Sequence, residues 1–297
     1  RKSLSDAQLS KWNRASPSNY GSGALSLPSP NELVPKNFTL LGGQGSVAEV
    51  KKRKRSDAEK KKLLEQPPAC ILSGRRDRWE VWHKLDFSFQ QPRTYAIFSL
   101  AIDRDAYNEL FVINSRLFTM CFMDSANEYL YEARLAGLNF NLEFTSRGLV
   151  LTFTGFSEKL PLFAEKMLKL LKDFKPDSKT YARFRDIQQR ELSGWKTQQP
   201  YYHANYYANQ ILETYQYDIP ALQIALDKAN IGMLNGFLDD NVGKKSFGTA
   251  LLAGNIDEKG AEMLVGLIDA SFSFSPLPES RRSRREALEL PLTPSSD

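Results

Sequence analysis

Residues with reactive side chains are scarce in this sequence. The 297 residues include only two cysteines, Cys70 and Cys121, and two histidines, His83 and His203. Two cysteines do not indicate a disulfide framework, and the apolar pattern around Cys121 predicts a buried, reduced thiol. The motifs H-E-x-x-H, H-x-x-E-H and C-x-x-C are all missing. Because zinc needs several such ligands in one place, the sequence predicts no metal site in this chain.

Signatures of nucleophilic catalysis and of phosphate binding are missing as well. The sequence contains neither a G-x-S-x-G motif nor a G-x-x-x-x-G-K-[ST] motif. Glu80 and His83 have E-x-x-H spacing, but they lie in the strand-like stretch "WEVWHKLD", where they would not share a helical face. We interpret His83 as an ordinary, partly buried histidine. We therefore expect no catalytic residue and no bound cofactor in this chain.

Long apolar runs are absent too. No stretch of about 18 apolar residues is present, so neither a membrane span nor a membrane partner is expected. The first residues, "RKSLSDAQLSKWNR", do not have the apolar region of a signal peptide. The chain does not begin with Met, which suggests a piece of a longer protein. The compartment is unknown from the sequence, although the small number of cysteines favours the cytoplasm.

Positive charge is concentrated in two short segments. The chain has 40 Lys and Arg against 35 Asp and Glu. "KKRKR" at 51–55 and "KKK" at 60–62 form one segment, and "RRSRR" at 281–285 forms the other. Such segments can bind polyanions. No aromatic residues lie between these charges to stack on bases, so we expect no nucleic-acid partner. We favour the interpretation that the two segments are a solvated loop and a solvated tail. The candidate polyanion-binding residues are Arg281, Arg282, Arg284 and Arg285.

Composition divides the chain into three parts. Residues 1–30 are rich in Ser, Pro, Asn and Gly and are predicted to be a linker from a preceding domain. Residues 31–275 form one predicted domain, with a basic insertion at about 42–64. Residues 276–297 are predicted to be a basic linker toward a following domain.

Apolar residues that alternate along the chain predict several strands. We expect strands in "WEVWHKLD", in "RTYAIFSLAI" and in "FGTALLAGN". Residues 138–144 and 149–154 alternate around the turn "SRG" and predict an antiparallel hairpin with one face on a core.

Helical spacing predicts a long helix that continues to Ala136. Asp103 or Asp105 is its expected N-cap, and a break is expected near Asp124 to Ala126. The order of elements predicts an α+β fold in which helices cover one face of an antiparallel sheet. Further helices are expected at about 158–173, 178–196, 201–217 and 220–241, and from Asp257 to about Ala270.

The richest cluster of aromatic and polar residues is "QQPYYHANYYANQ" at 198–210. On a helix, Tyr202, Tyr206 and Asn209 would share one face, and His203 and Tyr207 would share another. A ring with a polar tip suits a wall that binds peptide, so the candidate substrate-binding residues are Tyr202, His203, Tyr206 and Tyr207. The alternative is a helix that packs on its neighbours and keeps its hydroxyl groups at the water boundary.

Three stretches together resemble a known family. They are "LSLPSPNELVPKNFTLL", "NEYLYEARLAGLNFNLEFTSRGLVLTFTGFSEKLPLF" and "QQPYYHANYY". In this order they resemble the third, non-catalytic middle domain of the insulinase zinc metallopeptidase family, which includes pitrilysin and nardilysin. The similarity runs from about Leu25 to Pro278 and is interrupted by the basic insertion. The tail "LPESRRSRREALELPL" resembles the start of a fourth domain.

The resemblance implies a parent protein in which four related α+β domains enclose a chamber. The family's H-x-x-E-H motif belongs to the first domain, and the matching part of the long helix here, "LFVIN" at 110–114, has neither His nor an acid. The resemblance therefore implies that this chain is inactive alone and forms part of the chamber wall. Zinc is expected in the catalytic domain of the parent zinc metalloendopeptidase. The implied partners are the other domains of the same polypeptide and unfolded peptide substrates.

Two other hypotheses remain open from the sequence. The chain could be a stand-alone binding or scaffold module that engages polyanions or protein partners through its basic segments. An independent hydrolase is less favoured, because two histidines and no motif leave no catalytic constellation.

Overall fold

The computed structural model describes residues 30–41, 66–71, 77–86, 88–213 and 215–283, together with the single residues 5 and 10. The chain divides into two units, 1–32 and 33–297, and the elements named below belong to the second. The predicted linker at 1–30 and the basic insertion at 42–64 lie almost entirely outside the described residues, so those boundaries stay predictions. Among the described helices, none is both long and apolar enough to span a bilayer.

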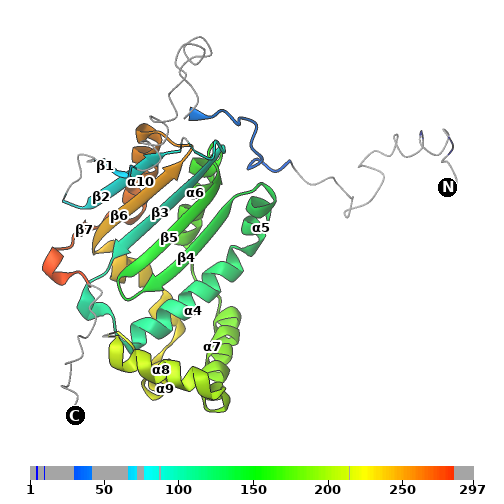
Figure 1. The fold of residues 1–297 in the computed structure, drawn as a ribbon. Coiled ribbons are helices and arrows are strands. Elements are labelled where there is room, and N and C mark those ends of the chain that lie inside the picture. The colour runs from blue at the N-terminus through cyan, green and yellow to red at the C-terminus, as the bar shows by residue number, and fades with distance from the viewer. Residues whose placement is uncertain are drawn as a thin grey trace, which may run out of the picture. The chain divides into compact units, whose positions relative to one another are not determined.

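Seven strands of the described residues form one sheet, six of them in the order β1-β2-β6-β3-β5-β4 (Figure 1). Neighbouring strands in this order are antiparallel except for β2 and β6, which are parallel. The seventh, β7, pairs with the beginning of β6. The strands are β1 (Ala69–Ile71), β2 (Trp79–Leu85), β3 (Arg93–Ala101), β4 (Asn139–Thr145), β5 (Gly148–Phe156), β6 (Lys245–Gly254) and β7 (Ser275–Pro276).

Side chains alternate along the strands so that one face of the sheet is buried. In β3, Ala96 and Phe98 are buried, whereas Tyr95 and Ile97 are exposed. β4, β5 and β6 follow the same period of two. Helices α6 (Leu160–Asp173) and α10 (Glu258–Phe272) lie behind the sheet in Figure 1, and no helix of the described residues covers the front face. The predicted α+β fold, with helices on one face of the sheet, is confirmed, and the parallel β2–β6 and β6–β7 pairs are its two departures from an antiparallel order.

The long helix breaks where the sequence predicted. α4 (Glu109–Ser125) ends before Ala126, and α5 (Asn127–Leu135) begins after it. The N-cap of α4 is Asn108, whose side-chain oxygen accepts a hydrogen bond of 2.9 Å from the backbone N–H of Phe111. The prediction of Asp103 or Asp105 as this cap is wrong, because Asp103 instead caps a short 3₁₀ turn at 104–106.

Two later helices end earlier than predicted. α8 (Pro200–Leu212) and α9 (Ile219–Lys228) stop short of 217 and 241, whereas α7 (Ser178–Ser193) ends near its predicted limit. After α9 the backbone is extended at Ala229 and Asn230, and Gly236 has a φ of 77°, which glycine adopts without a steric cost. A 3₁₀ turn at 231–234 and a π-helical turn at 239–243 therefore replace the expected helix.

Aromatic rings run in a line through the core beneath the sheet. The line begins on β3, passes through β5 and β4 to α4, and includes one ring from the segment just before the turn at 239–243. Each ring centroid lies between 5.0 and 6.4 Å from the next, and most of these contacts are edge-to-face or tilted. In order, the rings belong to Phe98, Phe153, Phe140, Phe122, Phe118, Phe237 and Phe111.

Candidate functional site

The predicted peptide-binding residues lie on α8, a helix with an unusual surface. Pro200 occupies its first position, where the missing N–H of proline is tolerated. None of the 13 residues of α8 is buried. Its sequence, "PYYHANYYANQIL", contains no Asp, Glu, Lys or Arg. An uncharged helix whose side chains are all accessible is a candidate contact surface.

Two of the four candidates face the body of the unit. The rings of His203 and Tyr206 each lie 4.5 Å from the Trp195 ring, measured between centroids. The Tyr206 hydroxyl accepts a hydrogen bond of 2.9 Å from the backbone N–H of Ile219, the first residue of α9. Burial raises the pKa of Tyr206. These two side chains therefore hold α8 against its neighbours.

The other two candidates face away from the unit. Tyr202 and Tyr207 are 48% and 59% exposed. Tyr201 and Ile211, which the sequence reasoning did not single out, are exposed to a similar degree. The Tyr201 and Tyr202 rings lie 4.2 Å apart between centroids, and a hydrogen bond between the two side chains raises the pKa of Tyr201. The ten-residue separation of Tyr201 and Ile211 could have placed them on the same side of a helix, but could not have shown that this side is exposed.

The candidate polyanion-binding arginines are only partly described. Arg281 forms ion pairs with Asp103 and Asp105, with nitrogen–oxygen distances of 2.8 and 2.9 Å. The guanidinium carbon of Arg282 lies 3.4 Å from the centroid of the Phe247 ring. Both guanidinium groups already interact with side chains of this unit, so they are less available to bind a polyanion. Arg284 and Arg285 lie outside the described residues.

The segment of α4 at 110–114, which the sequence resemblance places opposite a catalytic motif, is packed into the core. Phe111 contacts the rings of Tyr107, Phe144 and Phe237 at 5.4–5.9 Å between centroids. Asn114 is buried, and its amide nitrogen lies 3.8 Å from the Met233 sulfur. The segment at 110–114 therefore belongs to the core, and none of its five residues is a His, Cys, Asp or Glu that could bind a metal ion.

The histidines do not assemble a metal or catalytic site either. His83 is buried in β2, and its Nε2 atom lies 2.8 Å from the carbonyl oxygen of Ile256. This fits its interpretation as an ordinary strand histidine. His203 lies on α8, far along the chain from His83. Within the part of the chain that the structure describes, no three His, Cys, Asp or Glu side chains come together to hold a metal ion.

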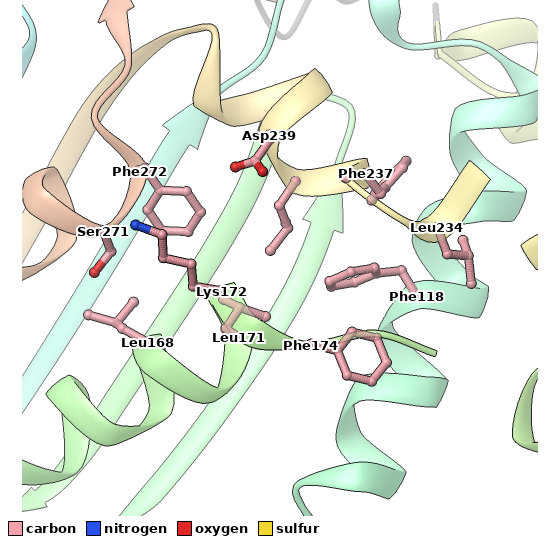
Figure 2. Close-up of a pocket in the computed structure, with 12 residues that line it drawn as sticks. Phe118, Leu168, Leu171, Lys172, Phe174, Leu234, Phe237, Asp239, Ser271 and Phe272 are labelled. Atoms are coloured by element: carbon pink, nitrogen blue, oxygen red, sulfur yellow. The ribbon is translucent and has the colours of Figure 1, made fainter. Parts of the chain in front are cut away.

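A small pocket opens between α4, α6 and the turn at 239–243 (Figure 2). Figure 2 shows Lys172, Asp239 and Ser271 on one side and aromatic rings on the other, including Phe118 and Phe174. Its volume is about 50 Å³. A space of that size accommodates a few water molecules but not a peptide.

A larger pocket, of about 250 Å³, lies where α6 and α10 begin. The segment 35–41, here called the strap, lines one side of it. Several polar side chains that line this pocket are hydrogen-bonded within the unit, among them Asn37, Thr94 and Asp257. Asn255 accepts a hydrogen bond from the Leu41 N–H and donates one to the Thr39 carbonyl, at 2.7 and 2.9 Å. These two hydrogen bonds attach the strap to the end of β6.

Comparisons with known proteins agree with this geometry. A family model described as the middle or third domain of peptidase_M16 matches residues 1–222. Insulin-degrading enzyme from Homo sapiens is 25% identical over 98% of this chain, which corresponds to 27% of that protein. A nardilysin-like protein from Arabidopsis thaliana is 26% identical over 91% of the chain and 25% of its own length.

A solved structure, the crystal structure of pitrilysin, has the same fold. It superposes with a TM-score of 0.71 at 14% identity, over 88% of this chain and 25% of the pitrilysin chain. The chain thus spans about a quarter of the length of the proteins it matches. With the family model covering most of its length, the chain belongs to the middle or third domain family of peptidase_M16.

Proposed function

We propose that this chain is a non-catalytic domain of an insulinase-like zinc metalloendopeptidase, forms part of the wall of a chamber that encloses peptides, and is inactive alone. One observation carries the proposal: the α4 segment at 110–114 contributes Phe111 and Ile113 to the core instead of a catalytic motif. The described residues supply no ligand set for zinc. The zinc of such an enzyme is therefore held by another domain, as the family assignment leads us to expect.

The uncovered face of the sheet supports a role beside other domains of the same polypeptide. Trp82 pairs with Leu251 in the parallel β2–β6 ladder, and Leu251 pairs with Ile97 in the β6–β3 ladder. These three residues form an apolar row across the front of the sheet, and Leu251 and Ile97 are each 37% exposed. An apolar row on an exposed sheet face is suited to packing against another protein surface.

α8 supports the role of a wall that contacts unfolded peptides. Tyr202 and Tyr207 offer exposed rings with hydroxyl tips, which combine contact area with hydrogen bonding. His203 and Tyr206 hold the helix that carries them. The alternative, a stand-alone module that binds polyanions through its tail, receives less support because Arg281 and Arg282 already have partners in the unit.

Peptidase assays test this proposal. The chain and the full-length protein to which it belongs are each incubated with zinc and an unfolded fluorogenic peptide. We expect cleavage by the full-length protein alone. Cleavage by the isolated chain that survives the double substitution His83→Ala and His203→Ala would overturn the proposal, as would tight, stoichiometric binding of zinc to the isolated chain.

A further inference from the structure

We infer that the outward face of α8 selects uncharged peptide segments that carry aromatic or aliphatic side chains. This inference rests on the proposed function, because it names the class of peptide that the wall would bind.

The inward and outward faces of α8 are separated by the helical repeat. The partly buried residues are His203, Tyr206 and Gln210, which follow one another at intervals of three and four. On the opposite side, Tyr201, Ala204, Ala208 and Ile211 follow the same intervals, with Tyr207 beside them. All of these outward residues are exposed. They form an apolar stripe in which two alanines leave room between larger side chains.

A second stripe beside the first consists of amides. Asn205 and Asn209 are exposed and four residues apart, so their side chains lie on one face. Each amide offers both a donor and an acceptor, which is what the N–H and C=O groups of an extended peptide backbone require. The two stripes together can hold a peptide backbone on the amides and place its side chains against the rings.

The charge of α8 limits which peptides fit. No Asp, Glu, Lys or Arg occurs between Pro200 and Leu212. Peptide side chains that carry a charge would therefore lose hydration on contact without gaining an opposite charge from the helix. Aromatic and aliphatic side chains lose no such hydration, and their burial is favourable.

The size of the surface favours a peptide segment over a second copy of the chain. A tyrosine side chain offers roughly 150–250 Å² when fully buried, so half-exposed Tyr201 and Tyr207 together with Ile211 offer on the order of 300 Å². A stable dimer buries about 800 Å² on each partner. The exposed part of α8 is therefore too small for a lasting dimer and suits a short, weakly bound segment.

The helix is held rigid before any peptide arrives. The contacts of Trp195 with His203 and Tyr206, and the hydrogen bond from Ile219 to Tyr206, join α8 to the preceding turn and to α9. A preorganised surface loses less conformational entropy on binding than a mobile one, which favours binding even by a small patch.

Peptide titrations of the intact chain test the inference. Two end-blocked peptides of equal length are used, one rich in Phe, Leu and Asn and the other with Lys and Glu at the apolar positions. Binding is followed by NMR shifts of the α8 amides. We expect the uncharged peptide to bind with a Kd on the order of 0.1–1 mM, independently of salt, and the charged peptide to bind at least about tenfold more weakly.

Substitutions on α8 test which of its side chains bind the peptide. The triple substitution Tyr201→Ser, Tyr207→Ser and Ile211→Ser is expected to weaken binding at least about tenfold, and Asn205→Ala with Asn209→Ala to weaken it severalfold. The matched control is Tyr131→Ser with Leu135→Ser on α5, where the tyrosine is as exposed as those of the stripe and the leucine as exposed as Ile211. The control should bind like the parent, and thermal melting checks that all variants fold.

Three outcomes would overturn the inference. They are equal binding of the charged peptide, unchanged binding by the triple variant, and self-association in sedimentation that the triple variant abolishes. None of these results depends on zinc or on peptide cleavage. A failure here is therefore distinguishable from a failure of the proposed function, which would show as cleavage or zinc binding by the isolated chain.

Discussion

The indole N–H of Trp79 donates a hydrogen bond of 2.9 Å to a carboxylate oxygen of Asp269, a residue 190 positions later in the chain. Both residues are buried, and the guanidinium of Arg78 also lies 3.3 Å from the same carboxylate. This contact joins β2, the outer part of the sheet, to α10 beneath it. A buried carboxylate that accepts hydrogen bonds from two side chains connects elements that come together only when the whole chain folds.

Replacement of Asp269 should therefore destabilise the unit. In Asp269→Ala the Trp79 N–H remains buried without an acceptor, and we expect a loss of about 2–3 kcal/mol in the free energy of unfolding. Urea denaturation followed by fluorescence measures the change. Asp227→Ala removes an exposed ion pair with Arg185 as a control and should change stability by less than about 1 kcal/mol. Equal effects of the two substitutions would contradict the assigned role of Asp269.

Two glycines should respond to alanine in opposite directions. Gly155 has a φ of 143°, and a Cβ atom there would lie 2.6 Å from the carbonyl oxygen of Gly137. Gly155→Ala should destabilise the unit by at least about 2 kcal/mol. Gly266 lies within α10, and a Cβ atom there would meet nothing within 4 Å. Gly266→Ala should stabilise by about 0.5–1 kcal/mol, and thermal or urea unfolding of the pair would show whether the signs differ.

The two cysteines should differ in reactivity. Cys121 is 1% exposed, and burial raises the pKa of its thiol to about 11. Below that pH the thiol stays protonated, and the thiolate is the reactive form. Cys70 is exposed. At pH near 8 a thiol reagent should modify one cysteine in the folded chain and two after denaturation, and Cys70→Ser should abolish the reaction of the folded chain. Rapid modification of two thiols in the native state would contradict this prediction.

Glu158 should make attachment of the strap depend on pH. Hydrogen bonds from the backbone N–H groups of Asn37 and Lys36 lower the pKa of this carboxyl below its ordinary value of 4.5. A group with a lowered pKa stabilises the fold above its ordinary pKa, and the contribution is lost as pH falls through the lower value. The amide proton shifts of Lys36 and Asn37 should therefore titrate with a midpoint below 4.5. Glu158→Gln should remove this titration, and a midpoint above 4.5 would show that the contact is absent.

Elements whose pattern is local could be predicted from the sequence. The hairpin of β4 and β5 has a strict period of two from Leu138 onward, and the structure pairs Phe140 with Phe153 across it. The break near Asp124 to Ala126 was also predictable, because the length of the helical pattern exceeded that of an ordinary helix. His83, interpreted as an ordinary, partly buried histidine in a strand-like stretch, lies in β2 as expected and is more buried than that, at 8% exposed.

Features that depend on distant parts of the chain could not be predicted in this way. The parallel pairing of β2 with β6 joins segments about 170 positions apart, as His83 with Leu252 illustrates, and no local pattern encodes that neighbour. α9 ends at Lys228 although apolar residues continue at helical spacing. The residues that follow form a short turn at 231–234 instead of extending the helix. The exposure of Tyr201 and Ile211 depends on what surrounds α8, which periodicity alone does not reveal.

Because none of its residues is buried, α8 should tolerate substitution, both in evolution and in the laboratory. Since the helix is anchored by Trp195, Tyr206 and the first turn of α9, its outward positions do not support the core. Random libraries at Tyr201, Ala204, Tyr207, Ala208 and Ile211 should keep the fold while altering what the helix contacts. α4 has no comparable freedom, because half of its side chains form the interior. The scaffold thus tolerates diversification on one helix and resists it on another.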